Sequence, residues 1–139
     1  MYCDQDDLIK RFGENEIIDL TDRERNGSIN VDVALSAIDD AKAKIDGYIS
    51  GRVTLPLIEV PPILKLFACD MARYYLYDES PTDVVKTRYE EAIAFLKDVS
   101  KGSVSLGIND SGSTPESNDL AMMESSGSVF GRSNSKDFI

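Results

Sequence analysis

Apolar side chains along residues 1–101 recur at helical spacing, and start and stop signals divide them into separate helices. The clearest pattern extends from Asn30, a suitable N-cap, to about Ser50, with Gly51 as the stop signal. Its apolar residues recur every three or four positions, so we expect one stripe of the helix to face a core. That stripe consists of Val31, Ala34, Leu35, Ile38, Ala41, Ile45, Tyr48 and Ile49.

Two further long helices are predicted after this one. Pro61 and Pro62 suit the first turn of a helix that continues to about Tyr77 and is apolar on nearly every face. Such a pattern is typical of a central helix surrounded by others. The last helix begins near Thr82 and ends at about Lys101, with Gly102 just beyond it. Its inward residues are expected to be Val85, Tyr89, Ala92, Ile93, Leu96 and Val99.

The remaining segments of residues 1–101 are shorter or irregular. Asp4 is a suitable N-cap for a helix that ends at Gly13, and a second short helix is predicted over residues 14–20. A polar loop over residues 21–27 follows, and its Asn26-Gly27 pair suits positive φ. Residues 53–60 are expected to form an extended crossover, because they contain a proline. The pattern therefore predicts an all-α fold, a small helical bundle of three main helices plus one or two short N-terminal helices.

The composition changes after Lys101, where we place a domain boundary. Residues 102–139 contain ten Ser and five Gly, with apolar residues between them. A segment of this composition is ordinarily a flexible tail, but its apolar side chains favour a second interpretation, in which neighbouring subunits or another protein order it. The residues predicted to make those contacts are Val104, Leu106, Ile108, Val129, Phe130, Phe138 and Ile139. The predicted organisation is a helical domain, residues 1–101, followed by an extended C-terminal tail, residues 102–139.

Charge and composition exclude several classes of protein. With 15 Lys and Arg against 25 Asp and Glu, the net charge is −10, which opposes binding to free nucleic acid. The chain has no His, which excludes the usual near-neutral general base and every His-activated nucleophile. Cys3 and Cys69 match no zinc or redox spacing, so we expect free thiols in a reducing compartment. Since neither a leader nor a membrane span is recognisable, we expect a soluble protein made in the cytoplasm.

Three local patterns suggest chemistry, and for each we favour a structural alternative. Residues 22–33 resemble a calcium-binding EF-hand loop, but Val33 occupies the position of the bidentate Glu, which favours a simple turn at Asp22. Tyr74 and Tyr75, beside Arg73, have the chemistry to stack on bases, yet at helical spacing aromatic residues more often form core or subunit contacts. Adjacent carboxylates on a helix point about 100° apart, which favours a solvated acidic face. The sequence thus predicts no catalytic, cofactor or metal site.

The sequence also carries an ordered series of short motifs over residues 1–108. They begin with Tyr2, Asp7-Leu8-Ile9, Arg11-Phe12-Gly13, Glu16, Leu20-Thr21-Asp22, Ile45-Asp46-Gly47-Tyr48-Ile49 and Gly51-Arg52. They continue with Leu55-Pro56-Leu57, Val60-Pro61-Pro62, Ala68-Cys69-Asp70-Met71-Ala72-Arg73-Tyr74, Leu76-Tyr77-Asp78, Arg88-Tyr89-Glu90 and Ala92. In these motifs the chain resembles the small Mu-like phage and prophage proteins that lie among head and tail genes and are regarded as head–tail connector, or adaptor, proteins.

The resemblance implies a structural virion protein, with neither enzymatic activity nor a cofactor, that assembles in the host bacterial cytoplasm and lies in the neck of the virion. Such a subunit forms a homo-oligomeric ring of roughly twelve copies. The ring would bind the portal protein on one side and a tail terminator or stopper protein on the other, and DNA would pass through its axial channel. An acidic channel suits this role, because carboxylates repel the DNA backbone. Two alternatives stay open: a tail-completion or stopper protein of the neck, and a calcium- or ligand-binding regulatory module. No membrane partner is expected.

Overall fold

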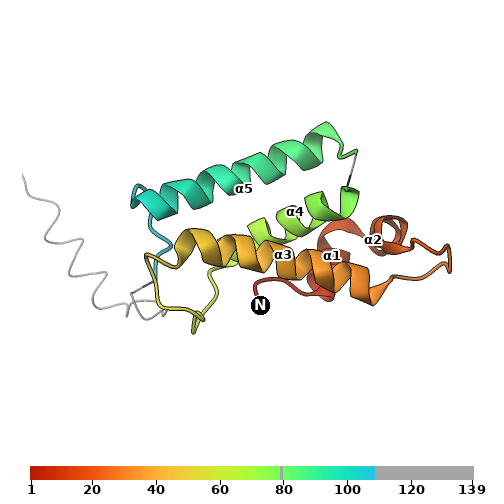
Figure 1. The fold of residues 1–139 in the computed structure, drawn as a ribbon, viewed down its shortest axis with the longest axis horizontal. Helices are drawn as coiled ribbons and strands as arrows, with labels where there is room; N and C mark the ends of the chain where they lie inside the picture. Colours follow the sequence, from red (N-terminus) through yellow and green to blue (C-terminus); the bar gives the residue numbers. More distant parts are fainter. Residues whose placement is uncertain (79, 109–139) are drawn as a thin grey trace, which may run out of the picture.

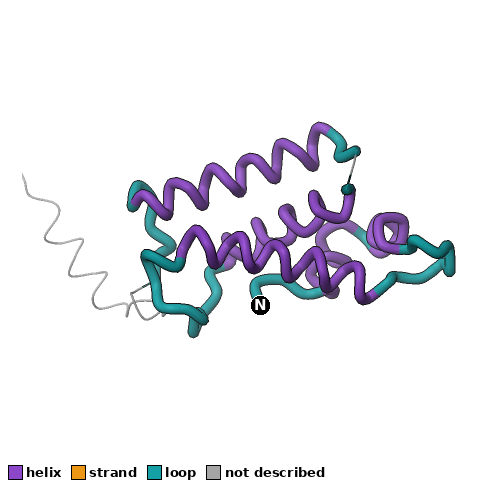
Figure 2. Tube along the Cα trace, viewed as in Figure 1, coloured by secondary structure: helices purple, strands orange, loops and turns teal. Residues whose placement is uncertain are grey.

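The computed structural model describes residues 1–78 and 80–108, and these residues form five α-helices and no β-strand (Figure 2). The helices are α1 (Gln5–Phe12), α2 (Glu14–Thr21), α3 (Val31–Ile49), α4 (Pro62–Tyr77) and α5 (Asp83–Lys101). The predicted all-α class is confirmed, with three long helices and two short N-terminal ones.

The ends of the helices follow from side chains and glycines that satisfy free backbone groups. Asp4 accepts a hydrogen bond from the amide of Asp7, and the Asp7 carboxylate accepts one from the amide of Asp4, which forms a capping box. Asn30 accepts from two amides at the start of α3, and Thr82 caps α5. Gly102 ends α5 in the left-handed conformation, with φ of +82°. The predicted caps Asp4 and Asn30 and the predicted end at Gly102 are therefore confirmed, and the cap at Thr82 agrees with the predicted start of the last helix.

The three long helices lie side by side as an antiparallel bundle, and α1 and α2 pack against α3 and α4 (Figure 1). α4 contacts all four other helices, which confirms its predicted central position. Its buried residues point to several sides of the helix, as a helix enclosed by others requires. The largest fully buried side chains of the core are Leu8, Ile17, Ile38, Ile45, Ile49, Leu64, Met71 and Leu96.

The inward face of α3 differs from the predicted stripe at its N-terminal end. Val31 is 49% exposed and Leu35 is 38% exposed, so the prediction that these two residues face the core is wrong. Ala34 and Ile38 are buried and set the direction of the contact with α4. Because neighbouring helical positions are about 100° apart, Val31 and Leu35 lie at the edge of that contact and remain in water.

The residues before α1 form a short strap across two of the long helices. Tyr2 and Cys3 are both buried. The Tyr2 hydroxyl donates a hydrogen bond to Asp46 of α3, while the Cys3 sulfur lies beside that of Cys69 in α4. Asp4 then caps α1, so the strap connects three helices within four residues.

Helix α2 extends one residue further than predicted, into the connection between α2 and α3. Thr21, placed in the loop by the sequence pattern, is the last residue of α2 and is fully buried. Its hydroxyl donates to the carbonyl of Ile17 and accepts from the amide of Asn30, which closes the base of the loop. Within the loop, Gly27 has the predicted positive φ of +81°, whereas the second residue with positive φ is Arg25, not the expected Asn26.

Candidate interaction surfaces

The first part of the predicted tail interface lies against the helical domain itself. Leu106 packs on the core, Ile108 is half-buried, and Val104 is 37% exposed. With Val53 and Val99, these three residues line a cavity of about 160 Å³. The other predicted interface residues, Val129, Phe130, Phe138 and Ile139, lie outside the described residues.

Arg52 joins the α3–α4 connection to the end of α5. Its Nε atom donates a hydrogen bond to the carbonyl of Ser100, at 3.0 Å. The guanidinium group also passes over Gly102, where a Cβ atom would lie only 2.9 to 3.2 Å from three of its atoms. Gly102 is therefore favoured for its positive φ, and a larger residue there would also displace the guanidinium group of Arg52. This contact explains why the chain turns toward the α3–α4 connection after α5.

The α3–α4 connection exposes aliphatic side chains that the sequence pattern did not single out. Ile58 is 70% exposed and Val60 is 37% exposed, whereas Leu55 and Leu57 pack on the core beneath them. Residues 53–60 contain neither helix nor strand, as predicted for this crossover. In the sequence, Val53, Leu55 and Leu57 alternate, so the signal available was that Ile58 and Val60 fall outside that alternation.

These exposed residues lie at the same end of the bundle as the start of the predicted tail (Figure 1). We call this end of the bundle, whose segments carry the exposed Ile58, Val60 and Val104, the apolar end. The exposed Val31, Leu35 and Val84 belong to the first turns of α3 and α5, which lie at the opposite end. Exposed aliphatic side chains at one end of a bundle make that end a candidate for contact with another protein.

The outer face of α3 is acidic. Asp32, Asp39 and Asp40 are all exposed along it. Farther along the helix, Asp46 forms an ion pair with Lys42, with 2.8 Å between Nζ and Oδ2, and this contact raises the pKa of Lys42. The adjacent pair Asp39-Asp40 lies in solvent, in agreement with the predicted solvated acidic face.

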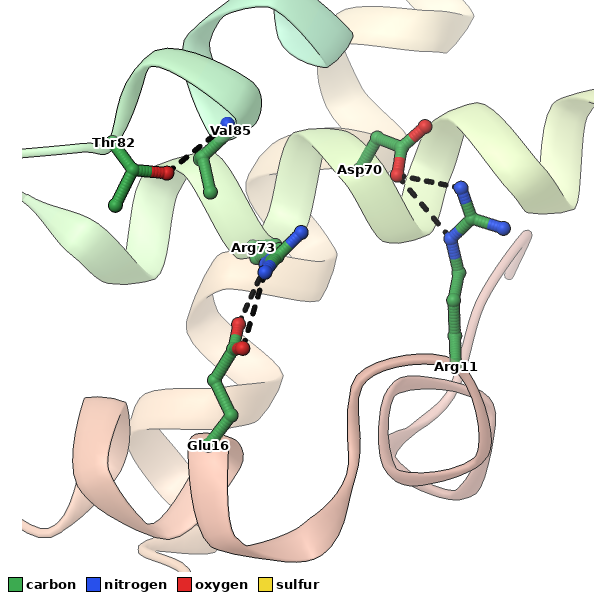
Figure 3. Close-up of polar contacts among 6 residues, drawn as sticks. All are labelled: Arg11, Glu16, Asp70, Arg73, Thr82 and Val85. Carbon is green, nitrogen blue, oxygen red and sulfur yellow. Dashed lines mark hydrogen bonds and ion pairs between the residues drawn. The ribbon is translucent and has the colours of Figure 1, made fainter.

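Besides a longer contact between Lys65 and Asp7, at 3.6 Å, two ion pairs attach the N-terminal helices to α4 (Figure 3). Arg11 donates twice to Oδ1 of Asp70, at 2.9 and 3.2 Å, and Asp70 is only 5% exposed. Arg73 donates to both carboxylate oxygens of Glu16, at 2.6 and 3.1 Å, and also lies over the ring of Phe12. Sequence reasoning missed both pairs, although an aspartate within an otherwise apolar helical stretch was a signal for the first.

The tyrosines considered for base stacking instead pack α4 against α5. The rings of Tyr74 and Tyr89 are stacked, with centroids 3.9 Å apart, and Tyr75 meets both of them edge-on. Burial raises the pKa of Tyr75, and a hydrogen bond to Tyr89 adds to the shift. The packing interpretation of this cluster is therefore confirmed.

The loop that resembles an EF-hand uses its first carboxylate within the turn. Both oxygens of Asp22 accept backbone hydrogen bonds, from the amides of Asn26 and Gly27, each at 2.7 Å. The favoured interpretation of a turn at Asp22 is therefore confirmed. Within residues 1–78 and 80–108, no group of three or more His, Cys, Asp or Glu side chains is arranged to hold a metal ion.

Comparison with known proteins defines the class to which this bundle belongs, the proteins of Mu-like phages and prophages. The chain is 40% identical over 139 residues to the Mu-like prophage FluMu protein gp36 of Haemophilus influenzae, an alignment that covers 100% of this chain and 99% of that protein. It is 34% identical over 133 residues to Gene product J of Escherichia phage Mu, covering 94% of each. The family described as Bacteriophage Mu, Gp36 matches residues 2–125. The chain therefore belongs to the Gp36 family of bacteriophage Mu.

The structure assigns packing roles to several motif residues on which the resemblance to this family was based. Arg11, Asp70 and Arg73 form the ion pairs on α4, and Arg52 fastens the end of α5. Neither relative's name describes an enzymatic activity. Within the described parts of the chain, no helix combines the length and apolar character needed to cross a bilayer.

Proposed function

We propose that this chain is a structural virion protein that acts as a head–tail connector, or adaptor, in the neck of the phage particle. Its copies form a closed ring that joins the portal protein to a tail terminator or stopper protein, around an axial channel for DNA. The observation that carries the proposal is an exposed apolar end on a phage protein of the Gp36 family. A helical bundle with such a surface, whose polar clusters serve packing and turns, is suited to joining other proteins.

The apolar end is the proposed contact between neighbouring subunits. Ile58, Val60 and Val104 would remain in water in a single copy, and burying them against the next copy is favourable. A contact between two different surfaces of the same chain closes into a ring when the rotation between copies is suitable. A ring matched to a portal would contain roughly twelve copies.

The exposed carboxylates of α3 are the proposed lining of the channel. Asp32, Asp39 and Asp40 are exposed positions of this helix. Negative side chains along a channel repel the phosphates of passing DNA, so that DNA slides through without being captured. The net charge of −10 agrees with DNA as cargo and not as a bound ligand.

The tail residues beyond Ile108 are proposed to add to the same ring. Val129, Phe130, Phe138 and Ile139 are apolar residues in a Gly/Ser-rich segment, and a segment that reaches over a neighbouring subunit enlarges the contact at high effective concentration.

Native mass spectrometry and negative-stain electron microscopy of the full chain test the subunit contact. We expect rings at micromolar concentration, and we expect Ile58→Asp to weaken ring formation at least tenfold, because a charge replaces a buried aliphatic side chain. Val84→Asp is the matched control, since Val84 is 57% exposed and belongs to the opposite end of the bundle. Equal ring formation by both variants would exclude the apolar end as the subunit contact.

Electron microscopy of the assembled phage particle tests the location. A ring of this chain between portal and tail supports the connector, whereas density on the tail side alone, without portal contact, supports the alternative of a tail-completion or stopper protein. A position away from the neck would refute both proposals.

A further inference from the structure

The two cysteines form a buried pair that joins the N-terminal strap to the central helix. The Sγ atoms of Cys3 and Cys69 lie 3.1 Å apart, although 66 positions separate them in the sequence. Both residues are free thiols, and their exposed fractions are 3% and 2%. This juxtaposition stands apart from the apolar end and from the acidic face of α3.

The surroundings of the pair hold the sulfurs in position. On one side of Cys3, Tyr2 is fixed to Asp46, and on the other side Asp4 is fixed by the capping box. Cys69 lies within the buried face of α4. Disulfide bond formation therefore requires only that the two sulfurs approach each other by about 1 Å.

A groove between α1 and α4 leads to the pair. It has a volume of about 330 Å³ and is lined by Lys10, Lys65 and Leu66, with Cys69 at its wall. Since the thiols are nearly enclosed, a small neutral oxidant fits this route better than a bulky one.

We propose that Cys3 and Cys69 are a site of oxidative modification, at which a peroxide converts the two thiols into an intramolecular disulfide. One thiol gives up its proton, its thiolate attacks a peroxide oxygen, and the O–O bond breaks, which leaves a sulfenic acid and a hydroxide ion that takes up the released proton to form one water. The second cysteine attacks that sulfur, the S–S bond forms, and the hydroxyl group leaves as a second water. Two thiols are thus oxidised, and one hydrogen peroxide is reduced to two waters.

Cys69 is the sulfur that reacts first. It lines the groove, whereas Cys3 is a buried residue of the strap and does not line the groove. The hydrogen bond between the thiols lowers the pKa of Cys69, and together with burial it raises the pKa of Cys3. The arrangement therefore favours Cys69 as the attacking sulfur and places Cys3 where it can resolve the sulfenic acid.

Treatment of the full chain with hydrogen peroxide tests the proposal. Peptide mapping should find residues 3 and 69 in one cross-linked peptide, about 2 Da lighter than the sum of its reduced parts. The melting temperature should rise by about 10 °C, because the bond closes a long loop of the unfolded chain, and dithiothreitol should reverse the rise. Cys3→Ser and Cys69→Ser should lose the cross-link and the rise.

Two results would overturn the proposal. One is that both cysteines remain available for alkylation after peroxide treatment and unfolding. The other is that the cross-links join separate chains. Comparison of the oxidised wild-type chain with the same sample after dithiothreitol needs no variant, so the test stands even where a serine variant folds poorly.

Discussion

Replacing Gly102 by Ala tests whether the end of α5 directs the chain toward the apolar end. Gly102 has φ of +82°, and an added Cβ atom would lie 2.9 Å from Nη2 of Arg52. A left-handed conformation costs a residue with a Cβ atom about 1–2 kcal/mol. Displacement of Arg52 from the carbonyl of Ser100 adds about 1 kcal/mol for the lost hydrogen bond. The expected loss in the free energy of unfolding is therefore about 2–3 kcal/mol.

Urea denaturation followed by circular dichroism measures this loss, and we expect the midpoint to fall by about 1 M. Gly107→Ala is one control, because Gly107 has φ of +77° with open space around it, so only the backbone strain applies. Gly47→Ala is a second control, for which we expect a rise in the free energy of unfolding instead of a loss. Gly47 lies within α3 with nothing nearby, so its replacement should stabilise the chain by about 1 kcal/mol.

The same substitution in an Arg52→Ala background separates the two contributions. Without the guanidinium group, Gly102→Ala should cost only the backbone strain, about 1–2 kcal/mol. An equal loss in both backgrounds would refute the role of Arg52. A loss for Gly102→Ala no greater than that for Gly107→Ala would refute it as well.

Three further predictions concern stability, each measured by denaturation of the full chain. Asp70→Asn should cost about 2 kcal/mol because it removes the charge of the buried partner of Arg11. Lys42→Ala, which breaks the pair with the half-buried Asp46, should shift the denaturation midpoint much less, and equal shifts would contradict this assignment. Thr82→Ala should cost about 1 kcal/mol through the lost cap of α5 (Figure 3), and an unchanged midpoint would exclude that cap. Burial raises the pKa of Tyr75, so its hydroxyl ionises at lower pH in the unfolded chain than in the folded chain. The free energy of unfolding should therefore fall as pH rises above the ordinary tyrosine pKa of 10.0. The fall should be less steep in the Tyr75→Phe variant than in the wild-type chain.

The helices were predictable from the sequence because their signals are local. Asp4, Asn30 and Thr82 each cap the helix that follows them, through hydrogen bonds that span at most three residues. The central position of α4 was predictable for a different reason, since only a helix enclosed by others tolerates apolar side chains all round.

The edges of the core were less predictable, because they depend on how helices cross. Val31 and Leu35 continue the apolar spacing of α3, yet the contact with α4 passes beside them. No pattern within a single helix specifies which edge of its stripe the neighbouring helix leaves uncovered.

The candidate surfaces required three-dimensional contacts. The ion pairs of Arg11 and Arg73 join residues 59 and 57 positions apart, a separation that charge spacing along the sequence does not specify. The tail residues Val104 and Leu106 were identified as apolar residues of a Ser- and Gly-rich segment, but their nearness to the α3–α4 connection follows from the turn at Gly102.

The order of the helices along the chain has a consequence for how the protein folds. α3, α4 and α5 are consecutive in sequence and adjacent in space, so their contacts are of low contact order and should form within microseconds to milliseconds. α1 and α2 can dock only on a surface that α3 and α4 have already built. During synthesis the N-terminal pair therefore leaves the ribosome first but completes its folding last, and substitutions at Arg11 or Glu16 should accelerate unfolding while leaving the refolding rate nearly unchanged.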